Sequence, residues 1–301
     1  MSELNNQANA ARTTDFFFRF EWVAMIVLFL SFAASPVKAQ TTATAAPVSQ
    51  LTPLQLEIEK QRQRLSFSET EERRDAVMHL GRMKRAESSR VAAGGLHDSA
   101  AIIRATAARA VLSLPADEAA ALLIPNLQDR DEFVRQETAY ALGETQSRIG
   151  VAPLIALLEK EKKDGVRGAI AVALGEIGDE AAVSPLSQLL SRRIAASGIL
   201  NKIRRSKKDE NEFVRRAAAR SLGQIRSRSA VPALIAVLLD KRAPDDVRRE
   251  AANSLGLIGD VSAGPALNSV LDERDPYLAQ TAREAILKLA KSGRSSLDSK
   301  Q

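Results

Sequence analysis

The sequence predicts an all-α protein, an α-solenoid (superhelix) of about seven helix-turn-helix repeats. Three observations lead to this prediction. A ten-residue motif returns at nearly constant spacing, Pro and Gly recur at fixed places around it, and the body of the chain is built from Ala, Leu, Ile and Val. Aromatic residues make up only 4% of the 301 residues. A core of small and medium aliphatic side chains suits closely packed helices.

The recurring motif joins a Val-Arg pair to a run of small residues and a Leu-Gly pair. Its clearest copies are "VRQETAYALG", "VRGAIAVALG", "VRRAAARSLG" and "VRREAANSLG", and weaker copies are "ERRDAVMHLG", "IRATAARAVL" and "LAQTAREAIL". The second position of the motif falls at residues 73, 104, 135, 167, 215, 248 and 279, so the steps are 31, 31, 32, 48, 33 and 31 residues. A period of about 31 residues accommodates two helices of about eleven residues and two short turns.

A second pattern follows the motif in most repeats, as in "VAPLIALLEK", "VSPLSQLLSR", "VPALIAVLLD" and "GPALNSVLDE". Pro lies near the start of each of these segments, where the N–H that it lacks costs a helix little. The Gly that ends the preceding motif is expected to close the first helix in a left-handed cap. These glycines are Gly143, Gly175, Gly223 and Gly256.

Together the two patterns resemble HEAT repeats, in particular the short bacterial type named after phycobilisome lyases. The resemblance covers residues 68–291 and implies the solenoid, but it says little about function because one fold hosts many functions. Residues 53–67 are predicted to form a helix that caps the first repeat. Residues 292–301 are expected to be a disordered tail.

The N-terminal region contains a continuous apolar run, "WVAMIVLFLSFAAS", over residues 22–35. Its length is typical of the apolar region of a signal peptide and is short for a membrane span, which needs about 20 apolar residues. "VKA" then supplies small residues for cleavage after Ala39, but the residues before the run are not net positive. Residues 1–39 are therefore interpreted as a signal peptide of an exported (periplasmic or secreted) protein or as an N-terminal membrane anchor. Residues 40–52 are interpreted as a flexible linker.

The arginine of the motif recurs at one position, and two interpretations are open. The arginines could form a cationic ladder for phosphate or carboxylate ligands, or they could hold the repeats together. The resemblance implies the second, with pairing to Asp98, Asp131, Asp164, Asp209 and Asp245, and the planar guanidinium suits bidentate pairing with carboxylates. We favour this structural role for Arg73, Arg104, Arg135, Arg167, Arg215 and Arg248.

The second helices are expected to line the concave face, where solenoids bind other chains. Outward-facing positions on these helices are mostly small or polar. Leu239 is the exception, and it is either an exposed anchor or buried against the next repeat. The candidate groove residues are Ala156, Gln188, Ala236, Leu239 and Ser269.

The 48-residue step marks an insertion at about residues 191–208. It carries Arg192, Arg193, Lys202, Arg204, Arg205, Lys207 and Lys208. The insertion is either a solvated loop or an element that binds an anionic membrane surface or nucleic acid. The net charge is only +6, and aromatic stacking residues are few and scattered beyond residue 40, which argues against nucleic acid.

No catalytic or cofactor-binding pattern is present in the sequence. The chain has no Cys, which excludes disulfides and thiolate chemistry. Its two histidines, His79 and His97, have no second ligand at metal-binding spacing, and we interpret His79 as partly buried and His97 as solvated. Bilin-lyase-like or chaperone activity follows only by family analogy. We therefore expect a non-enzymatic scaffold without a cofactor, which acts outside the cytoplasm and binds another protein in its concave groove.

Overall fold

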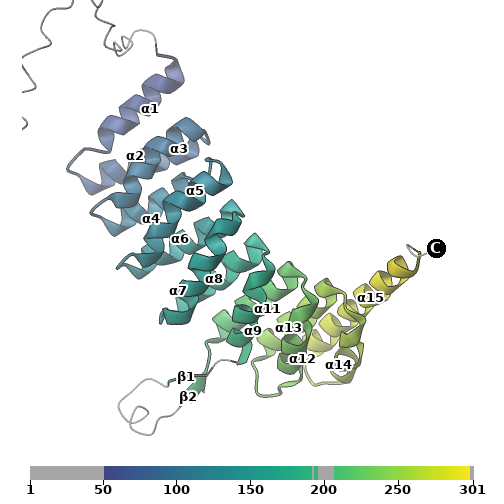
Figure 1. Ribbon diagram of the computed structural model, residues 1–301. Helices are drawn as coiled ribbons and strands as arrows, with labels where there is room; N and C mark the ends of the chain where they lie inside the picture. Colours follow the sequence, from purple (N-terminus) through teal and green to yellow (C-terminus); the bar gives the residue numbers. More distant parts are fainter. Residues whose placement is uncertain (1–50, 192, 196–206, 299–301) are drawn as a thin grey trace, which may run out of the picture. The chain divides into compact units, whose positions relative to one another are not determined.

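The computed structural model describes residues 51–191, 193–195 and 207–298. Within these residues the chain forms an α-solenoid of stacked helix pairs, which confirms the predicted fold class (Figure 1). In each repeat, the first helix carries the Val-Arg motif and the second helix carries the Pro-containing segment. The first helices are α2 (Thr70–Arg82), α4 (Ala101–Ala110), α6 (Glu132–Thr145), α8 (Asp164–Ile177), α11 (Glu212–Ile225), α13 (Asp245–Ile258) and α15 (Pro276–Asp298).

The second helices are shorter than the first helices. They are α3 (Ala86–Ala92), α5 (Ala116–Leu123), α7 (Val151–Lys160), α9 (Val183–Ser191), α12 (Val231–Leu239) and α14 (Gly264–Ser269). Short 3₁₀ segments extend or precede them at Ala93–His97, Ile124–Gln128, Arg148–Gly150, Glu180–Ala182, Arg228–Ala230 and Val261–Ala263.

Helix α1 (Pro53–Arg64) precedes the first repeat, in the stretch where the sequence predicts a capping helix. It begins in a capping box. The backbone N–H of Gln55 donates to Oγ1 of Thr52 at 3.3 Å, and that of Thr52 donates to Oε1 of Gln55 at 2.9 Å. The helix contacts α2 and α3, and it buries Ile58 in the core.

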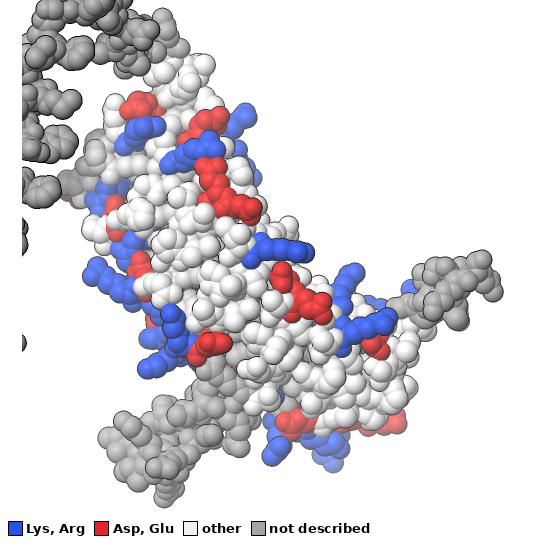
Figure 2. All heavy atoms as spheres, in the orientation of Figure 1, with Lys and Arg blue, Asp and Glu red and all other residues white. Residues whose placement is uncertain are grey.

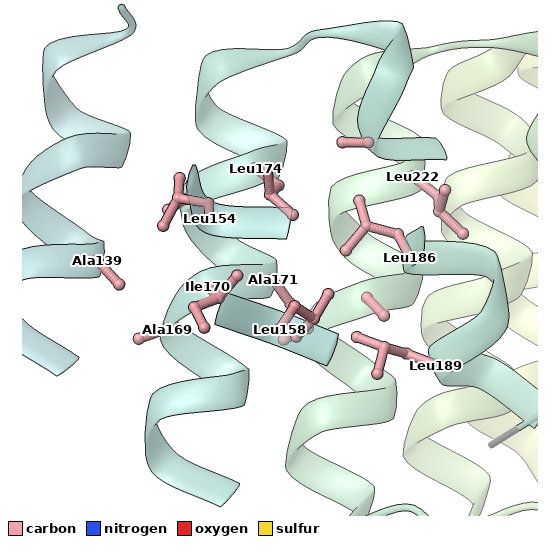
Figure 3. Close-up of a cluster of buried hydrophobic side chains, with 14 of the residues drawn as sticks. Ala139, Leu154, Leu158, Ala169, Ile170, Ala171, Leu174, Leu186, Leu189 and Leu222 are labelled. Atoms are coloured by element: carbon pink, nitrogen blue, oxygen red, sulfur yellow. The ribbon is translucent and has the colours of Figure 1, made fainter. Parts of the chain in front are cut away.

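Each first helix packs its small and aliphatic residues against a second helix. Figure 3 shows Leu154 and Leu158 of α7 among core side chains of α8, such as Ile170 and Leu174, all of them buried. The hydroxyl of Ser221 donates to the carbonyl oxygen of Ala171 at 2.7 Å and thereby joins α11 to α8. Burying this hydroxyl costs little because it is hydrogen-bonded.

The glycines at the end of the motif do not have the capping role that we predicted. Gly175 and Gly256 lie inside α8 and α13, and each helix continues for two more residues. The left-handed caps of α8 and α13 are formed by Gly178 (φ 73°) and Gly259 (φ 76°). Gly256 instead permits close helix packing, since a Cβ there would lie 2.8 Å from Cα of Ala285 in α15.

The inserted segment begins and ends in a short ladder that the sequence did not predict. Strand β1 (Arg193–Ala195) pairs antiparallel with β2 (Lys207–Asp209), with Arg193 opposite Asp209. The stack itself is not interrupted, because α11 packs directly against α8 and α9.

The expectation of a disordered tail over residues 292–301 is wrong for residues 292–298, where α15 continues to Asp298. The final segment contains no Pro, and a helix that is already nucleated extends at little cost. Residues 299–301 lie outside the described part of the chain.

Candidate interaction surface

The predicted groove residues all lie on second helices, and all are exposed. Ala156 belongs to α7, Gln188 to α9, and Ser269 to α14, while Ala236 and Leu239 belong to α12. The exposed fraction of Leu239 is 46%. The interpretation of Leu239 as a residue buried against the next repeat is therefore wrong.

The expectation that the second helices line the concave face stays a prediction. Successive first helices are in extensive contact, whereas successive second helices touch at few points. The first helices therefore form the more closely packed row, and we call the surface made by their exposed residues the inner surface. Small residues such as Gly256 and Ala285 make this close approach possible.

The recurring arginines lie at one edge of the first helices and are occupied by internal partners. Arg104 forms a fork with Asp129, with Nε to Oδ2 at 2.7 Å and Nη2 to Oδ1 at 2.8 Å. Its Nη1 donates to the carbonyl oxygens of Asp98 and Ser99 at 2.8 and 3.0 Å. Asp98 in turn accepts the fork of Arg73 at 2.8 and 3.0 Å. A carboxylate that pairs with one arginine therefore lies in the turn whose carbonyl oxygens bind the arginine of the following repeat. We call this series of arginines and carboxylates the arginine ladder.

The ladder continues along the described repeats. Arg135 forms the same fork with Glu161, Arg167 pairs with Glu210 and Asp164, and Nη1 of Arg248 donates to Glu273 at 2.8 Å. Arg215 is buried, and its charge acts on Asp240. The ladder continues across the insertion. Arg167 pairs with a carboxylate 43 residues later, whereas Arg104 and Arg135 pair with carboxylates 25 and 26 residues later.

Only some of the predicted acidic partners are used. Asp98 and Asp164 pair with ladder arginines as expected. Asp131 instead caps α6, because it accepts the backbone N–H of Phe133 at 2.9 Å. The partner of Arg248 is Glu273 rather than Asp245, and Glu210 is the partner of Arg167 next to the predicted Asp209.

Pairing with ladder arginines lowers the pKa of Asp98 and Asp129. The hydrogen bonds and the charge of Arg73 hold the pKa of Asp98 below its usual value, and Arg104 does the same for Asp129. Burial opposes both shifts but does not cancel them.

The inner surface carries a row of exposed apolar side chains that the sequence analysis missed. They lie two residues before the ladder position, at the start of their helices: Ile102, Phe133, Phe213 and Tyr277. The exposed fraction is 44% for Phe133 and 70% for Tyr277. The signal was available, because "EFVR" occurs twice and "AIIR" and "PYLA" align with it.

Phe213 and Tyr277 of this row each lie over the residue that follows the ladder position in the preceding repeat. The ring of Phe213 covers Gly168, where a Cβ would collide with it. The ring centre of Tyr277 is 5.2 Å from Cζ of Arg249, a cation–π contact. The row is thus a repeated structural position with a variable occupant.

Three first helices, α2, α4 and α6, border a hollow of about 510 Å³ on the inner surface. Met78, Ile102, Ala105 and Phe133 contribute most of its apolar lining. Its charged lining residues are Arg74, Arg82, Lys84, Arg109 and Glu137.

Some of these charges are already paired within the chain. Arg109 contacts Glu137 at 3.4 Å and Glu144 at 3.1 Å, and Arg74 contacts Glu71 at 3.2 Å. Among the residues that the structure describes, Arg82 and Lys84 form no ion pair. The hollow therefore combines an apolar floor with a basic border.

A family model for HEAT repeats matches residues 58–143, 120–196 and 199–287, which together cover more than half of the chain. The chain belongs to the HEAT-repeat family. A search of curated proteins finds no match.

The chain is similar to several solved structures. The complex of CpcE and CpcF of phycocyanin lyase from Nostoc is 22% identical, over 84% of this chain and 100% of that chain, with a TM-score of 0.47. Human deoxyhypusine hydroxylase is 18% identical over 78% and 96%, with a TM-score of 0.33. A designed armadillo repeat protein is 16% identical over 77% and 99%, with a TM-score of 0.37. At TM-scores below 0.5, none of the three supports an argument about function.

The HEAT repeats bring the two histidines to no common site. His79 is exposed rather than partly buried, and its Nε2 lies 3.3 Å from Oε1 of Glu57 in α1. His97 is exposed, as expected. Within the described ranges, no group of three His, Cys, Asp or Glu side chains is arranged to hold a metal ion. In the same ranges, none of the helices has the length and apolar character needed to cross a membrane.

Most of the basic insertion between the HEAT repeats lies outside the described residues. Arg192, Lys202, Arg204 and Arg205 lie outside the described residues. Arg193, Lys207 and Lys208 belong to β1 and β2, for which only the backbone is described. Binding of an anionic surface by this segment stays a prediction.

Proposed function

We propose that this HEAT-repeat chain is a non-enzymatic scaffold that binds a partner protein on its inner surface. The observation that carries the proposal is the row of exposed apolar residues, which runs into the hollow between α2, α4 and α6. Apolar patches with a polar border are typical of interaction sites, and aromatic and Arg residues are enriched at the centres of interfaces. Phe133, placed between the hollow and solvent, is the best anchor for such an interface.

The surface of the second helices is a weaker candidate. Its outward residues include Ala156, Gln188, Ala236 and Ser269, which offer little apolar area to bury. Figure 2 views this side of the molecule and shows a broad area without charged side chains, bordered by charges at its edges. Leu239 is the one large apolar residue among the predicted groove positions, so it serves as the test position for this alternative.

We further propose that the scaffold acts outside the cytoplasm. The support is the apolar run at residues 22–35, the small residues before Gln40 and the lack of Cys. Sequencing the N-terminus of the protein isolated from its native cells tests this. A mature chain that begins at Gln40 is expected for a signal peptide, and a retained N-terminus in the membrane fraction is expected for an anchor. A retained N-terminus in the cytosol would contradict both.

Photo-crosslinking in the native cells tests the proposed binding surface. A photoreactive amino acid is placed at Phe133 or Phe213 on the inner surface, and at Ala156 or Leu239 on the second helices as matched exposed controls. We expect the inner positions to trap a discrete protein that the control positions do not trap. Crosslinks from the second helices alone would overturn the assignment of the inner surface, and the absence of crosslinks from all four positions would overturn the scaffold proposal.

A further inference from the structure

We propose that the hollow between α2, α4 and α6 receives a large apolar side chain from an acidic segment of the partner protein. This inference rests on the proposed function and adds the chemistry of the partner. It follows from the shape of the hollow, the charges around it and the charges that lie further along the inner surface.

The hollow has the size and the lining of a site for an apolar anchor. Its volume of about 510 Å³ falls within the range of pockets that enclose ligands. Met78 contributes a flexible side chain to the floor, and such side chains adapt to the shape of an incoming group. Ile102 and Phe133 also line the hollow, at the starts of α4 and α6, and both are exposed.

The border of the hollow favours negative charge. Arg82 is the last residue of α2, and Lys84 follows it two residues later. Both line the hollow, and neither has an ion pair in the described part of the chain. A carboxylate on the partner can pair with them without breaking an internal contact, unlike a carboxylate that approaches Arg109, which already contacts Glu137 and Glu144.

The next part of the inner surface, at α6 and α8, disfavours a negatively charged ligand. Glu144 of α6 and Glu176 of α8 lie close together, because Glu176 reaches back over Gly143 in the same helix as Glu144. Burial and the charge of Glu144 raise the pKa of Glu176, and the charge of Arg220 opposes this shift. An acidic segment is therefore directed to the α2–α6 hollow and away from the middle of the stack.

A displayed peptide library tests the inference directly. The probe is a phage-displayed library of random twelve-residue peptides, selected on the full-length chain and sequenced. We expect enrichment of peptides that carry Phe, Leu or Trp next to two or more Asp or Glu residues. Synthetic copies of these peptides should bind at least tenfold more weakly to Phe133→Ala, and their affinity should fall as salt is raised.

Charge reversal provides the second arm of the experiment. The double variant Arg82→Glu with Lys84→Glu should lose at least tenfold in affinity for the acidic peptides. The matched control is Arg148→Glu with Arg228→Glu, which reverses two exposed arginines in turns away from the hollow and should leave affinity unchanged. Circular dichroism confirms that each variant is folded.

The inference is overturned if the enriched peptides are basic or uncharged, if no peptide is enriched, or if binding is equal in the hollow variants and the control. These outcomes are distinct from failure of the proposed function. A protein trapped by crosslinking at Phe133 through a segment without acidic residues would leave the scaffold in place and remove only the acidic partner.

Discussion

The arginine ladder and the inner surface lie only two or three residues apart on the same helices, yet they differ in how they vary along the chain. At the ladder position, Arg73, Arg104 and Arg135 make nearly the same fork with a carboxylate 25 or 26 residues later. Two residues earlier the occupants are Glu71, Ile102 and Phe133, which share neither size nor charge.

This difference distinguishes the residues that hold the stack of repeats together from the residues that are free to bind a partner. In a solenoid each repeat contacts only its neighbours, so every interface must be stabilised locally. A position whose side chain joins one turn to the next therefore carries the same type of residue in successive repeats. A position that only faces solvent has no such requirement, and its variation along the chain can match the chemistry of a partner.

The largest expected effect comes from breaking the ladder at its most buried step. Arg167→Ala removes a cation that pairs with Glu210, and the arginine side chain is only 3% exposed. Removing one partner of a buried ion pair typically costs about 3–5 kcal/mol. Urea denaturation followed by circular dichroism measures the loss in the free energy of unfolding.

The matched control for this prediction is Arg148→Ala. Arg148 is exposed and lies 3.7 Å from Asp179, so its removal should change the free energy of unfolding by less than about 1 kcal/mol. Equal effects of the two substitutions would mean that the ladder does not hold the stack together.

A smaller loss is expected from Asp129→Asn, together with a change in pH dependence. Hydrogen bonds to charged groups contribute about 1.5–3 kcal/mol, and this substitution weakens the fork of Arg104. Arg104 lowers the folded-state pKa of Asp129. The stabilisation is therefore present above the unfolded-state pKa of about 3.9 and is lost as pH falls toward the folded-state value.

Melting temperatures measured between pH 7 and pH 3 test this assignment. The wild-type chain should lose stability toward the acid end more steeply than Asp129→Asn. Parallel curves for the two proteins would show that Asp129 contributes nothing to the acid dependence.

Much of this architecture could be predicted from the sequence, because the buried residues recur at a regular spacing that is visible in the sequence. Steps near 31 residues predicted the helix pairs, and the 48-residue step placed the insertion. The arginine motif also indicated a structural role. These features depend on local patterns, each of which is complete within one or two repeats.

The features that could not be predicted depend on distances between helices. The same Leu-Gly signal can mean a cap or a close approach, and Gly175 turned out to lie inside its helix. How closely each row of helices packs is also not stated by the sequence, although the first helices are in far more extensive contact with one another than the second helices are. The exposed row at Phe133 and Phe213 was visible as a repeated "EFVR" but reads equally well as core.

A loss of about 1 kcal/mol is expected for Gly256→Ala, which tests the close packing of the inner row. The new Cβ would lie 2.8 Å from Cα of Ala285, a backbone atom that cannot rotate away. Overpacking costs about 1–3 kcal/mol, and the better helix propensity of Ala returns about 1 kcal/mol. Gly94→Ala is the control, since a Cβ there meets nothing within 4 Å. A stabilised Gly256→Ala variant would contradict the close approach of α13 and α15.

The smallest expected effect has the opposite sign and comes from the inner surface. Burial and the charge of Glu144 raise the folded-state pKa of Glu176, so the charged form is disfavoured in the folded protein. The resulting destabilisation is absent below the unfolded-state pKa of about 4.3 and develops as pH rises. Glu176→Gln should therefore raise the free energy of unfolding at pH 7 by up to about 0.5 kcal/mol and leave it unchanged near pH 4.

Thermal melts at pH 7 and pH 4 measure this difference, with the exposed Glu159→Gln on α7 as the control. A gain in stability at pH 7 in Glu176→Gln but not in the control would show that Glu176 carries an unfavourable charge on the inner surface. The ladder differs, because pairing with arginine lowers the pKa of Asp98 and Asp129. Because stabilising substitutions are found where binding rather than folding has determined the residue, such a gain would support a binding role for the inner surface. A loss of stability in Glu176→Gln would instead mean that Glu176 stabilises the fold, as the ladder carboxylates do. The contrast between the arginine ladder and the inner surface would then fail at this position.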